Sequence, residues 1–225
     1  MIRRNPNGDI PVVHESAFVD PTAILCGKVI VKENVFIGPY AVIRADEVND
    51  DGDMEPIVIG AGSNIQDGVV IHALKDKHVR VGGEPWAVYV GRDVSMAHDA
   101  LVHGPCYIGD DTFVGFKAVV HDAVVGSHCY IGIGAVVVGV EVPDGRFVPH
   151  GAIIDTADAV ERLSLVSDVH REFTEDVVEV NRGLVAAYRE HEEGPAAVRP
   201  RATEVERRGP SWDQRWQPDR DPSRF

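Results

Sequence analysis

The strongest constraint on the fold of this chain is an aliphatic residue that recurs at every sixth position. An α-helix repeats near 3.6 residues and a half-buried strand repeats at 2, so a sustained period of six fits neither. Short strands joined by tight corners do fit, because three six-residue units close one triangular coil and stacked coils bury a continuous apolar interior. With two insertions and one five-residue step, the period runs through Val19, Leu25, Val31, Ile37, Ile43, Ile59, Ile65, Ile71, Val90, Met96, Val102, Ile108, Val114, Val120, Val125, Ile131 and Val137. We therefore predict a parallel β-helix of hexapeptide repeats over residues 1–153.

Small residues and glycines accompany this period. A small or modest residue often lies four positions after the aliphatic one, as at Ala23, Ala41 and Ala100, and we expect it to point inward where the coil turns. Glycine often follows the aliphatic residue directly, as at Gly60 and Gly109. We expect it to relieve backbone strain at the corner. Two polar insertions, residues 44–56 and 74–87, must loop out of the coil.

The repeat stops beyond Gly151, and helical patterns follow. Asp155 or Thr156 can cap a short helix that ends near Leu163. A second helix is expected from about Arg171 to Gly194-Pro195, packed on the prism through apolar residues at helical spacing. Those residues are Phe173, Val177, Val180, Leu184, Ala187 and Tyr188. The fold class is thus all-β with a C-terminal α-helical segment, residues 154–194. Residues 195–225 are expected to form a flexible tail, or a short segment that packs on a neighbour through Trp212 and Trp216.

Charge and cysteine content exclude several classes of protein. The net charge is −14, and residues 195–225 hold seven arginines against five acids, a net +2, which leaves −16 for the rest. Residues 1–194, with this negative charge, should repel the phosphate backbone of nucleic acids, so we expect no nucleic-acid partner. No apolar run approaches the roughly 20 residues of a membrane span, and no signal peptide is evident. Cys26, Cys106 and Cys129 are widely separated and are expected to be free thiols in the cytoplasm.

Three of the ten histidines lie close together in the repeat, at His72, His98 and His103. Because Ile71, Met96 and Val102 occupy the inward positions, these imidazoles should point outward near a corner. A single outward histidine is most often an ordinary surface residue. That interpretation is given to His14, His121, His128, His150, His170 and His191. Three neutral imidazoles on neighbouring coils instead match the ligand set of a catalytic zinc, which leaves a fourth position for water. The spacing leaves open whether the three converge.

These residues carry a resemblance to a known family. The segments NIQDGVVIHA (64–73), VSMAH (94–98) and VHGP (102–105) resemble those of the gamma-class carbonic anhydrases. IRADE (43–47), VPDGR (142–146) and VVEVN (177–181) fit as well, and the similarity runs from about residue 12 to 188. Single hexapeptides are shared with many acyltransferases. The ordered set of three histidines with Arg44, Gln66 and Asp67 is much more specific.

The resemblance implies a fold, a reaction and an assembly. It implies a left-handed β-helix with the C-terminal helix packed on the prism, and reversible hydration of carbon dioxide to bicarbonate and a proton. It also implies a homotrimer with metal sites at the subunit interfaces. His72 and His103 of one subunit and His98 of its neighbour would bind Zn²⁺, with Fe²⁺ or Co²⁺ as alternatives, because imidazole suits all three.

The resemblance further implies roles for residues around the metal. Gln66 and Asp67 would orient the metal-bound hydroxide, although Asp67 could instead hold the turn before Gly68. Arg44 and Asp46 would form an ion pair near the subunit contact, either as part of the site or as a purely interfacial bridge. Glu47 would help to move protons and Asn181 would border the carbon dioxide pocket.

The chain departs from the archaeal prototype at two positions. Lys75 lies where that enzyme has its proton-shuttle glutamate, and Glu179 lies where it has a tyrosine. With a reference pKa near 10.4, a lysine is a poor proton acceptor at pH 7. Asp76, His78, Glu84 or external buffer would have to replace the glutamate.

Two other functions compete with this hypothesis. A hexapeptide acyltransferase would use one histidine as general base and coenzyme A as cofactor, but it would need basic residues for the cofactor's phosphates, whereas this body is acidic. A non-catalytic scaffold or assembly module could have kept the metal site, and the two tryptophans of the tail favour this alternative.

Overall fold

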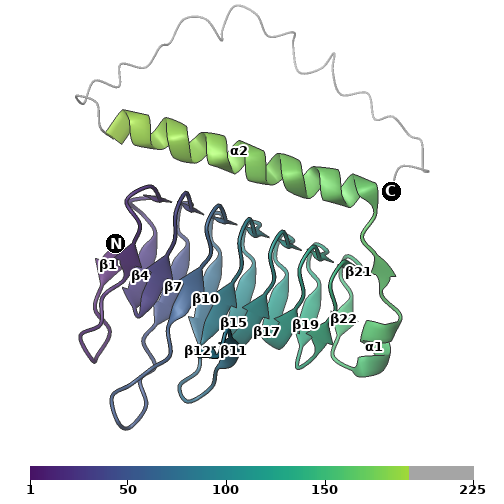
Figure 1. Ribbon diagram of the computed structural model, residues 1–225, viewed down its shortest axis with the longest axis horizontal. Coiled ribbons are helices and arrows are strands. Elements are labelled where there is room, and N and C mark those ends of the chain that lie inside the picture. Colours follow the sequence, from purple (N-terminus) through teal and green to yellow (C-terminus); the bar gives the residue numbers. More distant parts are fainter. Residues whose placement is uncertain (193–225) are drawn as a thin grey trace, which may run out of the picture. The chain divides into compact units, whose positions relative to one another are not determined.

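The computed structural model describes residues 1–192, and in it short parallel strands wind into a prism with three faces (Figure 1). The first face consists of β1 (Ile2–Arg3), β4 (Ile24–Gly27), β7 (Val42–Ala45), β10 (Val70–Ala73), the start of β15 (Leu101–Ile108), the start of β17 (Val119–Val125), β19 (Val136–Val138) and β22 (Ile153–Ile154). The second consists of β2 (Val12–Val13), β5 (Val29–Val31), β8 (Ile57–Ile59), β13 (Val88–Val90), the ends of β15 and β17, and β20 (Glu141–Val142). The third consists of β3 (Phe18–Val19), β6 (Phe36–Ile37), β9 (Asn64–Ile65), β14 (Ser95–Met96), β16 (Phe113–Val114), β18 (Tyr130–Ile131) and β21 (Arg146–Val148).

The six-residue period fills the interior of this prism. Every aliphatic residue of the period from Leu25 to Val137 is buried, whereas Val19 in the first coil is half-buried. The small residues between them, such as Ala41 and Ala100, are fully buried as well. Burying one such aliphatic side chain contributes about 1.5–3 kcal/mol. The interior therefore contributes a large part of the stability of the prism.

The glycines that follow the aliphatic residues have a different role from the one predicted. Their backbone is not left-handed, so they do not relieve strain. A Cβ on Gly60 would lie 2.2 Å from the carbonyl oxygen of Gly91, and one on Gly109 would lie 2.4 Å from the nitrogen of Ser127. Stacked strands are only about 4.8 Å apart, so a side chain there would push the next coil away. The left-handed backbone lies two residues later, for example at Gly62 and Asp111.

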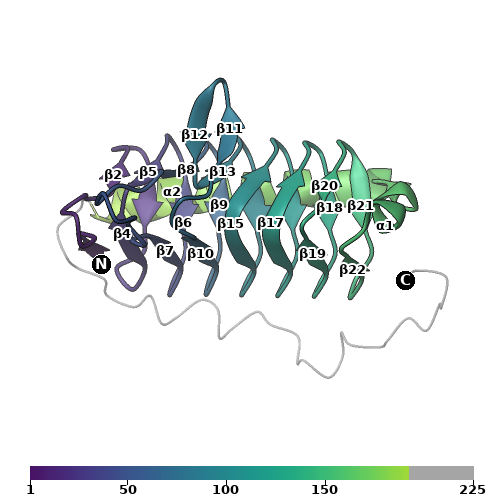
Figure 2. The same ribbon diagram turned by 90° about the horizontal axis from the view of Figure 1, so that it is seen from below.

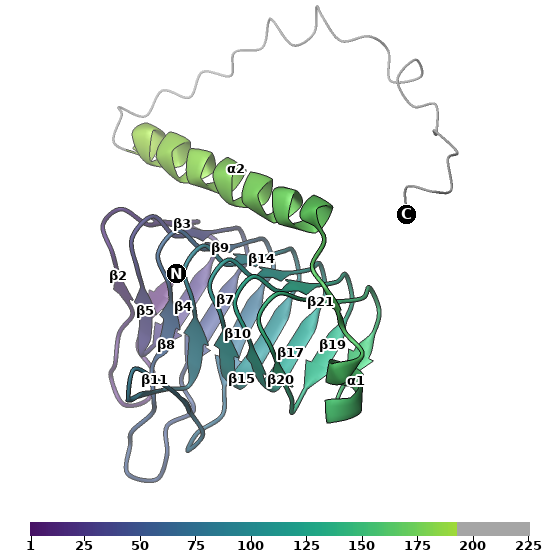
Figure 3. The ribbon, with the colours of Figure 1, turned by 45° about the vertical axis from the view of Figure 1, so that its right-hand side comes forward.

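Both polar insertions leave the prism at the corner between the first and second faces (Figure 3). Residues 46–56 connect β7 to β8 as an irregular loop. Residues 74–87 were predicted only to loop out, yet they contain an antiparallel hairpin of β11 (Val79–Val81) and β12 (Glu84–Trp86), which projects from the prism in Figure 2. Its turn residues, Gly82 and Gly83, have φ angles of 62° and 88°, as a two-residue hairpin turn requires.

The helical region follows β22. The short helix α1 (Ala157–Glu161) is capped by Thr156, whose side chain accepts the N–H of Ala159. After β23 (Ser164–Leu165), the helix α2 (Asp168–Glu192) runs back along the third face (Figure 1). It begins earlier than predicted, at Asp168. The predicted end of the helix at Gly194-Pro195 and the predicted tail 195–225 lie outside the described residues. Neither helix of residues 1–192 is both long and apolar enough to cross a bilayer.

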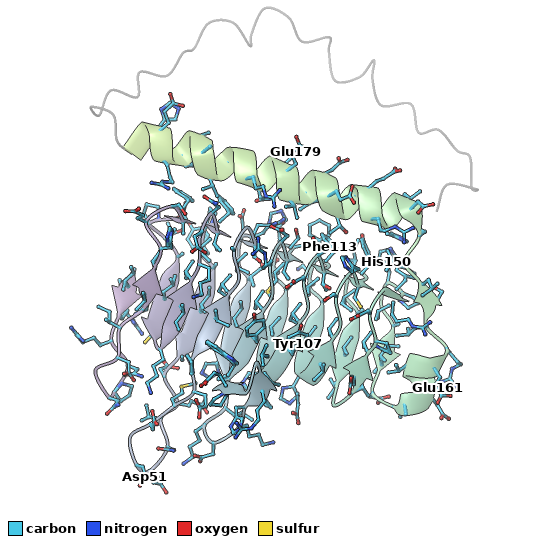
Figure 4. All side chains as sticks on the ribbon, in the orientation of Figure 1. Asp51, Tyr107, Phe113, His150, Glu161 and Glu179 are labelled. Atoms are coloured by element: carbon cyan, nitrogen blue, oxygen red, sulfur yellow. The ribbon has the colours of Figure 1, made fainter. Side chains whose placement is uncertain are left out.

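The packing face of α2 agrees with the prediction only in part. Its buried residues are Thr174, Val178, Asn181 and Val185, none of which was predicted. Of the predicted contacts, Phe173 and Tyr188 lie against the rings of Phe113 and Phe18, and Val177 packs on the cluster around Phe113, although Phe173, Val180, Leu184 and Tyr188 are 36–62% exposed. The reason lies in the third face, whose outward positions carry the large rings of Phe18, Phe36, Phe113, Tyr130 and Phe147. In Figure 4, Phe113 lies between the prism and α2. Shorter side chains fit directly over such rings, and the longer apolar ones flank them.

The three cysteines are free and buried. Burial raises the pKa of Cys106 to about 12 and that of Cys129 to about 11. Cys26 lies in β4 opposite the outward-facing Arg44 of β7, yet it is buried, and its thiol lies 3.5 Å from the carbonyl oxygen of Arg4, just after the neighbouring strand β1. The prediction of free thiols is thus confirmed.

Candidate metal centre in two halves

One half of the candidate site is a column of side chains on the first face. Arg44 in β7, His72 in β10 and His103 in β15 occupy the same register in successive coils. Because Ile43, Ile71 and Val102 point inward, the residue after each of them must point outward. His121 in β17 continues the same register. We call Arg44, His72, His103 and His121 the histidine column.

The two central imidazoles of the column face each other. His72 Nδ1 lies 3.3 Å from His103 Nε2, and the ring planes are nearly perpendicular, at 75°. His103 Nδ1 lies 3.3 Å from the carbonyl oxygen of Gly104. A carbonyl only accepts, so the proton of His103 belongs on Nδ1, and its Nε2 presents a lone pair toward His72. Burial lowers the pKa of His103 below its usual range, which favours the neutral imidazole.

Two carboxylates and one guanidinium surround the other side of His72. Its Nε2 lies 3.2 Å from Asp46 Oδ1, 3.2 Å from Arg44 Nη2 and 3.7 Å from Glu47 Oε1. Arg44 Nε and Asp46 Oδ2 form an ion pair at 3.5 Å. Asp46 can accept a proton from His72 Nε2, whereas Arg44 Nη2 can only donate to that nitrogen, so these contacts hold the ring in place without selecting one tautomer. The two facing nitrogens, His72 Nδ1 and His103 Nε2, are therefore the candidate metal ligands on the first face.

The other half lies at the corner between the third and first faces, and we call Gln66, Asp67, His98 and Asn181 the corner cluster. His98 Nδ1 lies 3.8 Å from Asp67 Oδ2, and the two side chains are 52% and 54% exposed. The His98 ring stacks on Phe116 with a centroid distance of 5.6 Å and an interplanar angle of 18°. His98 is therefore supported on one side and open to solvent on the other.

Buried hydrogen bonds orient Gln66 in this cluster. Its Nε2 donates to Asn64 Oδ1 at 3.0 Å, and Asn64 Nδ2 donates to Ser95 Oγ at 2.7 Å. Strand register places Asn64 and Ser95 between Phe36 and Phe113 on the third face. The row of large rings is thus interrupted by two smaller polar side chains.

A groove of about 520 Å³ lies at this interruption. Phe36 and Phe113 line it together with all four residues of the corner cluster. Asn181 belongs to the buried stripe of α2, and its Nδ2 donates to the carbonyl oxygen of Val177 at 2.9 Å. The groove is therefore mainly apolar, with polar groups gathered at His98.

The structure brings the predicted site residues together in two groups rather than one. His72 and His103 lie with Arg44, Asp46 and Glu47, whereas His98 lies with Gln66, Asp67 and Asn181. Within residues 1–192 of a single chain, no three His, Cys, Asp or Glu side chains are close enough to hold one metal ion. His98 precedes β15 and His103 is the third residue of that strand, which rises about 3.3 Å per residue. The two groups thus lie near opposite ends of the strands of the first face.

Sequence reasoning missed His121, Asn64 and Ser95. His121 was taken as an ordinary surface residue, although it lies 18 residues after His103, which is one full coil of three hexapeptides. That separation alone predicts the same column. Asn64 and Ser95 carried no sequence signal, because their importance depends on the rings above and below them.

The residue at the expected shuttle position has a partner. Lys75 Nζ lies 3.4 Å from Asp50 Oδ1 in the 46–56 loop, and both side chains are exposed. The tip of that loop at Asp51 lies at the side of the prism away from α2 (Figure 4). Asp76, His78 and Glu84 are also exposed, in or just before the hairpin. The four candidate proton acceptors, Lys75, Asp76, His78 and Glu84, thus follow the first-face strand β10, on the side of the histidine column.

Comparison with solved structures shows the fold. The chain is similar to a hexapeptide transferase family protein from Anaplasma phagocytophilum, with a TM-score of 0.66 and 22% identity over 84% of this chain and 98% of that one. A putative acetyltransferase from Bacillus cereus gives a TM-score of 0.67 and 22% identity over 85% and 98%. The predicted left-handed β-helix is thereby confirmed. No family model matches the chain.

Comparison with curated proteins shows the family. A carbonic anhydrase of Methanosarcina thermophila is 39% identical over 198 residues, which cover 83% of this chain and 78% of that protein. The carboxysome assembly protein CcmM of a Nostoc species is 43% identical over 178 residues, 78% of this chain but only 31% of that longer protein. Because the first relative is matched over most of its length, the chain belongs to the family of the gamma-class carbonic anhydrases.

Proposed function

We propose that this protein catalyses the reversible hydration of carbon dioxide to bicarbonate and a proton. In this proposal the histidine column of one subunit meets the corner cluster of the next in a homotrimer. The observation that carries it is the pair of His72 Nδ1 and His103 Nε2 at 3.3 Å, with the third histidine in a separate, open cluster. A convex prism cannot enclose an ion alone, so a second surface must complete the site.

The donor set fits a divalent metal ion held by His72, His103 and the neighbouring subunit's His98. Two nitrogen ligands at 2.0–2.1 Å from a tetrahedral ion lie about 3.3–3.4 Å apart, and the observed separation is 3.3 Å. Zn²⁺, Fe²⁺ and Co²⁺ all accept imidazole ligands. Such an ion would supply Lewis acidity that lowers the pKa of bound water to about 7.

The chain's own residues supply orientation and proton transfer. Gln66 is fixed through its Nε2 by Asn64, so its Oε1 can accept a hydrogen bond from the attacking water. Asp67 lies 3.8 Å from His98 and can accept a second one. The apolar groove beside them, with Asn181 at its wall, suits a small uncharged substrate such as carbon dioxide.

Proton release is assigned to the other half of the site. Glu47 lies 3.7 Å from His72 and is 43% exposed, so it links the site to solvent. The proton must then pass to buffer or to a surface group, because Lys75 is paired with Asp50 and is a poor acceptor near neutral pH.

A scaffold function is the second candidate, and the similarity to CcmM favours it. In that case the protein would keep the metal site for assembly without catalysis. An acyltransferase function rests on likeness of fold alone, and the net charge of −16 outside residues 195–225 disfavours binding of coenzyme A phosphates.

We also propose a cytoplasmic location, because all three cysteines are free thiols.

One experiment separates these functions. Metal content and carbon dioxide hydration are measured on the same sample of anaerobically purified protein, together with its mass in solution. About one metal ion per chain, a trimeric mass and hydration activity are expected. Metal without activity would favour the scaffold, and a metal-free active transferase would overturn the proposal.

A further inference from the structure

His121 lies directly beside His103, one coil further along the prism. In the pairing of β15 with β17, Val102 is opposite Val120 and His103 is opposite His121. The next residue in this register is Val138 of β19. His121 therefore ends the run of polar side chains in the histidine column.

His121 contacts both the backbone and the ring of His103. Its Nδ1 lies 3.2 Å from the carbonyl oxygen of His103, and since a carbonyl only accepts, the His121 proton belongs on Nδ1. The two rings meet at a centroid distance of 5.2 Å and an angle of 64°. On its opposite side, the His103 ring meets His72 at 5.2 Å and 75°. The His103 ring is thus held between two imidazoles.

The backbone at this point departs from regular pairing. The register of β15 against β17 shifts between His103 and Cys106. Such a bulge re-aims the side chain beside it. The carbonyl oxygen of His103 receives the Nδ1–H of His121 and also the thiol of Cys106, at 3.2 Å. These two side-chain donors fix the peptide group that sets the direction of the His103 side chain.

The bulge also bears on the tautomer of His103. Its Nδ1 donates to the carbonyl oxygen of Gly104, which lies within the bulge. A rotation of the peptide after His103 would therefore disturb both the direction of the side chain and the partner that keeps its proton on Nδ1. Either change would turn the Nε2 lone pair away from His72 Nδ1.

We infer that His121 is a positioning residue for His103. Its Nδ1–H anchors the His103 peptide at the bulge, so that the His103 Nε2 faces His72. The inference rests on the proposed function in so far as it concerns metal binding, but the tautomer of His103 can be measured without any metal. If His121 only filled space, a side chain of the same size would replace it. If His121 positions His103, the replacement must also keep a hydrogen-bond donor at the place of Nδ1.

Two substitutions of His121 distinguish the effect of its hydrogen-bond donor from the effect of its size. His121→Asn places an amide N–H where Nδ1 was, and His121→Phe keeps a ring of similar size without a donor. His128→Phe is the control, because His128 lies at another corner and its side chain is 64% exposed. Each variant is assayed as full-length protein for mass in solution and for the unfolding temperature without metal.

The first readout is Co²⁺ affinity, by competition with a chelating dye, together with the visible spectrum of the Co²⁺-loaded protein. Residues that orient a metal ligand typically contribute 10–100-fold to affinity. His121→Phe should therefore bind Co²⁺ about 10–100-fold more weakly and with an altered spectrum, whereas His121→Asn and His128→Phe should stay within about threefold of the parent. Equal affinity in His121→Phe and the parent would overturn the inference.

The second readout is the nitrogen NMR spectrum of His103 in metal-free protein. The Nδ1–H tautomer should dominate in the parent and in His121→Asn, and it should lose population in His121→Phe. An unchanged tautomer in His121→Phe would refute the positioning role even if the parent bound no Co²⁺. If neither the parent nor any of the variants binds Co²⁺, the proposed function is refuted instead.

Discussion

The histidine column and the corner cluster differ in how firmly they are held. His72 is 13% exposed, and its contacts with Arg44 and His103 join three successive coils through paired strands. His98 and Asp67 are 52% and 54% exposed, and each follows a two-residue strand at a turn. Pairing of parallel strands fixes which side chains lie next to each other in successive coils. A turn only places a side chain near a corner of the prism. The column is thus organised within one chain, whereas the exposed pair of His98 and Asp67 in the corner cluster depends on what packs against it.

The largest expected effects come from removing the histidines themselves. His72→Ala, His103→Ala and His98→Ala should each weaken metal binding by more than about 100-fold, since even indirect partners of a ligand contribute 10–100-fold. The unfolding temperature of the metal-free protein should change little, because the interior stabilises the prism. If His98→Ala kept its metal while His72→Ala lost it, the corner cluster would not belong to the site.

Mixing two of these variants tests whether the halves come from different subunits. A His98→Ala subunit offers an intact His72 and His103, and a His72→Ala subunit offers an intact His98. After joint denaturation and reassembly at equal ratio, roughly a quarter of the interfaces in a head-to-tail ring should be complete. Hydration activity should recover to about that fraction. Mixed trimers without metal or activity would show that the site is not shared.

The corner cluster can also be disturbed without touching a ligand. Asn64→Ala removes the bond that orients Gln66 and leaves the hydroxyl of buried Ser95 without that partner. We expect a loss of about 1–3 kcal/mol in stability. We also expect roughly a tenfold loss in kcat, in the lower range for a lost orienting contact, with the metal content unchanged.

Thr112→Ala is a matched control, since Thr112 is buried and its hydroxyl donates to the carbonyl oxygen of Gly126 at 2.9 Å, far along the chain from Gln66. It should lose similar stability and keep its kcat. An equal fall in kcat for both variants would mean that Gln66 needs no orientation by Asn64.

A smaller effect is expected at Lys75. Lys75→Glu supplies a carboxylate where the family has its shuttle, and turnover at low buffer concentration should rise if proton release limits the rate. Asp50→Asn breaks the same exposed ion pair without adding an acceptor, so it should leave turnover unchanged. No gain in Lys75→Glu would mean that another group already accepts the proton, or that proton transfer is not limiting.

The smallest effect concerns the start of α2, which covers the third face. Burial lowers the pKa of His170, whose ring stacks on Phe147 at 4.5 Å. Since the folded pKa lies below the unfolded one, the unfolded chain binds more protons, and stability falls as the pH drops from about 6.5 through the folded pKa. Urea unfolding of the parent and of His170→Gln across this range should show a shallower pH dependence in the variant. Parallel curves would contradict the assignment to His170.

Several features followed from the sequence because they depend on local pattern alone. The six-residue period predicts the buried interior from Leu25 to Val137, and its alternation directs His72 and His103 outward. Helix chemistry predicted a cap of α1 at Asp155 or Thr156, and the structure has it at Thr156. The choice of the fully buried residues of α2 did not follow, because both Phe173 and Val178 satisfy a helical period and only the rings of the third face decide that Val178 is covered and Phe173 lies beside them.

The sequence by itself determined the coil, the interior and the histidines that face outward, since each depends on the two-residue alternation of a strand repeated every six residues. Only the tertiary structure decided which outward residues meet. Register between coils, shifted by two insertions of different length, aligns Arg44, His72, His103 and His121 in one column. His98 lies only five positions before His103 in the sequence, yet it belongs to the other group, because a corner lies between them. Contacts between coils are set by stacking across tens of residues, and no local spacing encodes them.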